Sequence, residues 1–352
     1  MRLIYALGVG TAAMLMSSAP ALAEVTADVF GFSQFTGENF ENDNEDFDLG
    51  FDRVRIGGKA TAGAAFAGFQ LDFNAEPTRD RITGSLPNVV QDLFVGWNLN
   101  SNHSIKVGQF KTPIGMDFNI PGRSLDITKR GFETALVLQR DLGLMFSGRK
   151  LGGVFGYDIG IFNPAGRSGA VFGADKDPFD QEGEDYAAAG RLLYDPTAAL
   201  HFEASYGHSE DAGGSDASDN YQVFDLAGRY RHGPFTFKGE YINRSNVRGV
   251  SDRDQRVYYV HGGWFVLPKL EAVVRHYDGA TNDPGGNTEL RNTYYGVNVF
   301  LGPPEDTTNV RLQINYLDAG GDGSNFTGVG GFRSDAFLVQ LQLSGDFRLY
   351  PR

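Results

Sequence analysis

The sequence predicts an all-β protein, a 16-stranded antiparallel transmembrane β-barrel. Three observations lead to this fold class. Short segments alternate between apolar and polar residues, the connections between them alternate between long and short, and the chain starts with an export signal. Residues 337–343 show the alternation clearly, with Phe337 and Leu341 on one face and Gln340 and Gln342 on the other.

Residues 1–23 have the features of a signal peptide. Arg2 is followed by a mostly apolar stretch, and Ala21-Leu22-Ala23 is a small-x-small cleavage site. The apolar stretch is short for a membrane anchor, and no later segment approaches the roughly 18 apolar residues of a spanning helix. We therefore expect cleavage after Ala23, a barrel domain over 24–352, and a bacterial outer-membrane location.

The composition excludes several classes of function. The chain has no cysteine, so it has neither disulfides nor thiolate metal sites. Its formal net charge of −13 argues against a nucleic-acid partner, which would require a basic face. Abundant glycine (47 residues) and 13% aromatic residues are typical of β structure with turns and aromatic girdles.

The alternation predicts sixteen strands in order along the chain. They cover 24–36, 51–63, 66–76, 90–99, 104–111, 140–150, 153–163, 185–195, 200–210, 221–232, 234–246, 256–267, 269–280, 290–302, 308–319 and 334–347. Short connections carry turn residues, as in His232-Gly233-Pro234 and Leu267-Pro268-Lys269. Long outer loops and short periplasmic turns are the pattern of membrane barrels, and an even strand count places both termini on the periplasmic side.

Charged residues identify the inner face of the strands. In 53–59, three cations share one face, and in 235–241 Lys238 and Glu240 lie opposite Phe235 and Phe237. A Lys or Arg facing lipid at mid-membrane would cost about 2–4 kcal/mol, so these side chains should face the lumen. A soluble β-sandwich or propeller is the alternative, but no blade-length repeat is present. The predicted pore wall comprises Arg53, Arg55, Lys59, Lys106, Lys238 and Arg311.

The connection 112–139 is the longest and is the third long one. A loop of this length is usually functional or disordered, and its apolar residues need a surface to pack on. Because a sixteen-stranded barrel leaves an aqueous channel, we expect this loop to fold inward and narrow it. The alternative is a surface loop that latches a neighbouring subunit. The predicted constriction residues are Lys111, Arg123, Asp126, Lys129, Arg130, Glu133 and Arg140.

Charges over 111–140 favour cations slightly, at five against three acids. Rings of Arg and Lys favour anions in a pore, so we expect a mild anion preference. The alternative is that each cation pairs with a neighbouring acid and only fixes the loop.

Two segments on either side of this loop carry a family resemblance. Residues 105–115 read IKVGQFKTPIG and residues 139–148 read QRDLGLMFSG. This block resembles the phosphate-selective porin O and P family. The resemblance implies a sixteen-stranded outer-membrane porin, usually a homotrimer, with an inward-folded third loop and phosphate as a candidate solute. The chain departs from the usual aromatic strand end, because five residues follow Phe347.

No motif points to catalysis. The six histidines show no metal-ligand spacing, and Ser147, Ser205 and His208 match no nucleophile motif. We expect no enzyme activity, no catalytic residues, no metal site and no cofactor. The expected partners are small anionic or neutral solutes, outer-membrane lipid and lipopolysaccharide.

Acids gather in two of the predicted outer loops. Such loops should be solvated, and they suggest a second hypothesis: a plugged barrel with an adhesive or structural role at the cell surface. The first group is Glu38, Glu41, Asp43, Glu45, Asp46, Asp48 and Asp52, and the second lies within 175–185.

Overall fold

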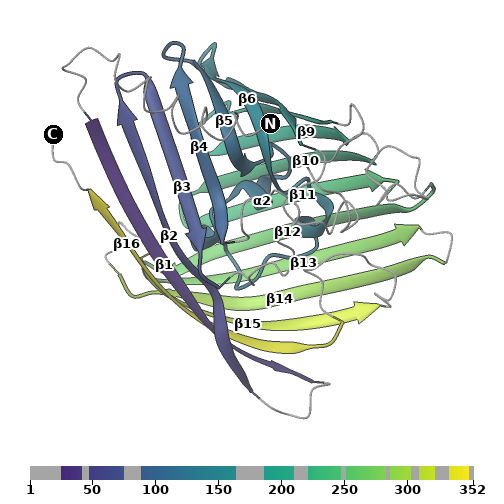
Figure 1. Ribbon diagram of the computed structural model, residues 1–352. Coiled ribbons are helices and arrows are strands. Elements are labelled where there is room, and N and C mark those ends of the chain that lie inside the picture. Colours follow the sequence, from purple (N-terminus) through teal and green to yellow (C-terminus); the bar gives the residue numbers. More distant parts are fainter. Residues whose placement is uncertain are drawn as a thin grey trace.

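The computed structural model describes residues 25–41, 47–74, 89–163, 186–209, 221–246, 251–282, 286–302, 309–321 and 333–348. Sixteen antiparallel strands form a closed barrel, in which each strand pairs with its neighbours in sequence and β1 also pairs with β16 (Figure 1). The predicted fold class and strand count are confirmed. The predicted signal peptide, the acidic group within 175–185 and the tail 349–352 lie outside the described residues.

The strand bounds agree with the predicted ones to within a few residues. The first connection differs most, because β1 continues to Phe40 and β2 begins at Asp48. The strands are β1 Val25–Phe40, β2 Asp48–Ala62, β3 Ala65–Asp72, β4 Val90–Asn98, β5 His103–Lys111, β6 Arg140–Leu151, β7 Phe155–Phe162, β8 Ala187–Tyr194, β9 Leu200–Ser209, β10 Tyr221–His232, β11 Phe235–Ser245, β12 Asp254–Leu267, β13 Leu270–Asn282, β14 Thr288–Phe300, β15 Val310–Gly321 and β16 Ala336–Arg348.

Short connections lie at one end of the barrel, which we call the short-turn end. Only a few residues separate β2 from β3 and β12 from β13 there. β1 begins and β16 ends at the same end, since Asp28 near the start of β1 is paired with Arg348 at the end of β16. The opposite end carries the long connections, including 112–139.

Burial on the strands is inverted relative to a soluble protein. Phe237 is 52% exposed, whereas its neighbours Lys238 and Glu240 are 6% and 4% exposed. The apolar face therefore points outward and the polar face inward, as expected for a barrel wall in lipid. Within the described ranges, no helix combines the length and the apolar character needed to cross a membrane.

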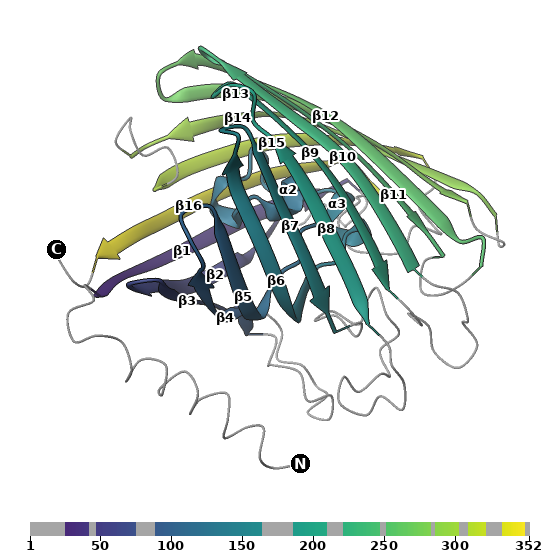
Figure 2. The same ribbon diagram turned by 90° about the horizontal axis from the view of Figure 1, so that it is seen from above.

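Helical turns occur only in the connection 112–139 among the described residues. They are α2 Met116–Asn119, the 3-10 turn η1 Gly122–Ser124 and α3 Glu133–Leu136. Figure 2 shows α2 and α3 within the ring of strands. Apolar side chains of this segment, such as Ile114 and Phe132, are buried in one cluster with inner-face residues such as Tyr277.

Candidate functional site

Residues 112–139 are held by side chains on the inner face of the barrel. Arg311 on β15 donates to the carbonyl of Leu125 (2.7 Å), and the Thr128 amide donates to Asn315 (2.9 Å). A segment with so little regular structure leaves backbone groups that need partners when buried. The polar inner face supplies them, so the same alternation that builds the wall also anchors the segment.

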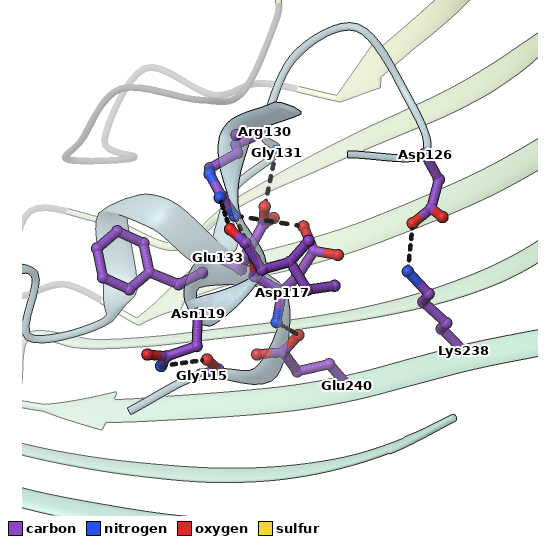
Figure 3. A network of polar contacts seen from close by, with 12 residues as sticks. Gly115, Asp117, Asn119, Asp126, Arg130, Gly131, Glu133, Lys238 and Glu240 are labelled. Carbon is purple, nitrogen blue, oxygen red and sulfur yellow. Dashed lines mark hydrogen bonds and ion pairs between the residues drawn. The ribbon is translucent and has the colours of Figure 1, made fainter. Parts of the chain in front are cut away.

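A buried guanidinium lies at the centre of this contact. Arg275 on β13 is fully buried and pairs with Asp117 (3.3 Å) and Asp126 (2.8 Å). Lys238 on β11 also reaches Asp126 at 2.6 Å (Figure 3). Burial alone would raise the pKa of Asp126, but the charges of Lys238 and Arg275 hold it well below its usual range. Asp126 is thus ionised and bound between two cations.

Two further acids lie nearby, and among the described residues neither forms an ion pair. The Asp117 amide donates to Glu240 (3.0 Å), and the Gly131 amide donates to Glu133 (3.0 Å; Figure 3). Burial, reinforced by the neighbouring charge of Asp117, raises the pKa of Glu133 to about 7. Arg130 donates to the carbonyls of Asp117 and Ile120 and so closes the turn around α2.

The other side of the segment borders open space. A cavity of about 650 Å³ lies between η1 and the inner faces of β1–β4. Among the described residues, six cations and three acids line it. They are Arg55, Lys59, Lys111, Arg123, Arg140 and Arg348, with Asp28, Asp92 and Asp346.

The thirteen predicted site residues separate into two groups. One group lines the cavity: Lys111, Arg123 and Arg140 from the predicted constriction, with Arg55 and Lys59 from the predicted wall. The other lies in the contact between segment and wall or beside it: Asp126, Lys129, Arg130, Glu133, Arg53, Lys106, Lys238 and Arg311.

Several of the cavity cations have acidic partners. Arg55 pairs with Asp72 (2.7 Å), Arg140 with Asp92 (2.9 Å) and Arg123 with Asp346 (2.7 Å). Lys111 instead donates to the carbonyls of Phe118 and Ile120.

Two lysines differ from these cations. Across the described ranges, neither Lys59 nor Lys106 forms an ion pair, and Lys106 lies over the ring of Phe110 at 4.0 Å.

The first acidic group needs a correction. Glu38 and Asp48 belong to strands, and Glu38 and Asp52 both face Lys129 of the inward segment. These two acids anchor the segment, whereas the sequence suggested solvated outer loops. Asp43, Glu45 and Asp46 lie outside the described residues.

Sequence reasoning missed Arg275 and Glu240 as anchors of the segment. The inward direction of Glu240 was predicted with that of Lys238, and the same alternation on the neighbouring strand also indicates that of Arg275. In the part of the chain that the structure describes, no group of three or more histidine or acidic side chains could hold a metal ion.

The family model of the phosphate-selective porin O and P matches residues 23–344. The chain belongs to this family. As a porin it forms a passive diffusion channel of the outer membrane. Membership of this family indicates a channel rather than an enzyme. No curated protein matches the chain.

Solved structures with a similar fold are outer-membrane barrels of low sequence identity. An anion-selective porin from Comamonas acidovorans superimposes with a TM-score of 0.66 at 16% identity, over 92% of this chain and 100% of that one. OmpF of Salmonella typhi, solved with daunomycin, gives 0.66 at 12% identity, over 91% and 97%. OmpT of Vibrio cholerae in its trimer form gives 0.60 at 12% identity, over 91% and 99%.

Proposed function

We propose that this porin prefers small anions mildly over cations, and that residues 112–139 form its constriction. The charge of the cavity lining carries the proposal: six cations face three acids in a chain whose overall formal charge is −13. Cations that line a narrow aqueous path lower the energy of a passing anion. The three acids are each within hydrogen-bond distance of a cation, so the unpaired charge in the lining is positive.

Lys59 is the most informative residue for testing the ion preference, because it is exposed in the cavity and has no ion pair within the described ranges. The experiment is the reversal potential of single channels in a planar bilayer under a KCl gradient. We expect chloride preference in the wild type and a shift toward potassium in Lys59→Glu. Lys269→Glu, in an exposed turn, is the matched control and should leave the potential unchanged.

Potassium preference in the wild type would overturn the anion proposal. Absence of any conductance steps would instead favour the plugged, adhesive barrel. Phosphate is a candidate solute because of the family description. Whether it enters the channel can be measured in the same experiment from its competition with chloride.

Assembly and processing are part of the proposal. We infer a homotrimer, supported by the trimer form of the similarly folded OmpT, with cleavage of the signal peptide after Ala23. The apolar outer face would contact lipid and lipopolysaccharide. Native mass spectrometry should give three chains per particle, and N-terminal sequencing of the exported protein should begin at Glu24.

A further inference from the structure

Phenylalanine rings lie along the cavity wall opposite the segment 112–139. Phe30 on β1 and Phe94 on β4 both line the cavity. Each ring occupies the space above a glycine of the neighbouring strand, and a Cβ on Gly57 or Gly68 would collide with the ring of Phe30 or Phe94. The glycines thus allow the rings to lie along the wall, where they leave the lumen open.

Lys59 lines the same cavity as the two rings. On the β3 side it is directly opposite Gly68, which in turn is paired with Phe94. On the β1 side it is directly opposite Asp28, whose carboxylate pairs with Arg348. Along β2 it is two positions from Gly57, the glycine beneath Phe30. Both glycines that lie beneath a ring are therefore neighbours of Lys59 on the inner face.

Two cations lie over these rings. The guanidinium of Arg123 is 5.5 Å from the centre of Phe30, and the ammonium of Lys106 is 5.1 Å from that of Phe94. Phe94 also contacts Phe66, with ring centres 6.4 Å apart. Aromatic surface and positive charge therefore meet in this cavity and directly beside it.

This combination discriminates between classes of anion. A compact inorganic anion such as phosphate is strongly hydrated, and phenyl rings offer it no hydrogen bonds in return. A flat aromatic ring gains from stacking against Phe30 and Phe94 in addition to the area that it buries. A carboxylate on that ring would reach the ammonium of Lys59.

We propose that this cavity is a binding subsite for small aromatic carboxylates. The aromatic ring lies between Phe30 and Phe94, and the carboxylate pairs with Lys59. The proposal rests on the anion-preferring channel above and names the class of solute that this channel retains longest.

The test uses the full-length protein in a planar bilayer with symmetric KCl. Benzoate, acetate, phosphate and glucose are each titrated in, and the block of the chloride current is measured. Benzoate should block at a concentration roughly 2- to 10-fold lower than acetate, the range expected for one aromatic pair. Phosphate should block no better than acetate, and glucose should not block.

Variants locate the subsite. Phe94→Leu and Phe30→Leu should each raise the blocking concentration of benzoate to nearly that of acetate. Phe94→Tyr, which keeps the ring, should retain the preference for benzoate. Lys59→Gln should weaken the block by both benzoate and acetate. Phe237→Leu removes a ring from the exposed outer face and is the matched control, with no expected effect.

Equal block by benzoate and acetate in the wild type would overturn the subsite, and so would equal block by glucose, which would indicate a sugar site. A channel without KCl steps would refute the conduction function itself. Equilibrium dialysis of radiolabelled benzoate against detergent-solubilised protein then still decides the subsite, since binding displaced by acetate as readily as by benzoate would refute it.

Discussion

The inner faces of β11–β15 and of β2–β4 show the same alternation in sequence, but only the first is covered by the segment 112–139. On β11–β15, which we call the covered wall, inward residues such as Arg275 and Gln313 are fully buried beneath the segment 112–139. On β2–β4, the open wall, Lys59 is exposed in the cavity and glycines hold aromatic rings against the backbone.

The difference shows what decides the role of an inward cation. Arg275 on the covered wall fixes the segment through two buried acids, whereas Lys59 on the open wall is exposed and forms no ion pair within the described residues. Direction alone places both in the lumen. Coverage by the segment decides which of them is an anchor and which stays exposed in the cavity.

The largest effect should come from removing the central anchor. Arg275→Met leaves Asp117 and Asp126 buried with fewer cations, and breaking a buried ion pair in this way costs about 3–5 kcal/mol. We expect the segment to leave the covered wall, which would raise the single-channel conductance and lower the unfolding temperature. Lys269→Met, in an exposed turn that does not line the cavity, is the control and should change neither. Unchanged conductance in Arg275→Met would contradict the anchoring role.

A smaller effect should follow from adding one methyl group to the open wall. Gly68→Ala would push against the ring of Phe94, and overpacking of this kind costs about 1–3 kcal/mol. Gly262→Ala is the matched change in β12, where the nearest atom to the new methyl is 4.0 Å away. Thermal unfolding of the two variants in detergent should separate them, and equal melting temperatures would show that the ring moves freely.

The pH dependence of the covered wall provides a third comparison. The pKa of Glu133 in the folded protein, about 7, exceeds its ordinary value of 4.5, so the folded state binds this proton more tightly. The stabilisation is fully present below about pH 4.5 and is lost as the pH rises through 7.

Glu133→Gln should therefore flatten the fall in melting temperature between pH 5 and pH 8. Glu289→Gln, an exposed acid on β14, should keep the wild-type pH dependence. A wild-type melting temperature that rises over this pH range would refute the assignment.

The smallest effect is expected for the pair between Arg123 and Asp346. These side chains are 27% and 53% exposed, and exposed ion pairs contribute about 0–1 kcal/mol. Arg123→Gln should leave the melting temperature nearly unchanged while reducing the chloride preference slightly in the reversal potential. A large loss of stability would place Arg123 among the anchors of the segment.

Much of the architecture could be predicted from the sequence. The period of two sets the direction of each side chain, and turn residues divide the strands, so the strand count and the inward direction of Lys238 and Arg311 needed no further information. The cost of a charge in lipid determines which face points outward, because only the polar face can line water.

The tertiary structure alone decided which inward groups meet. Lys238 and Asp126 are 112 positions apart, and their contact depends on ring closure and on the path of the segment 112–139. The contact between Phe94 and Gly68 likewise depends on the register of two strands joined by a long connection. Alternation is a local property of the chain, whereas the covering of one wall and the opening of the other result from packing across the barrel.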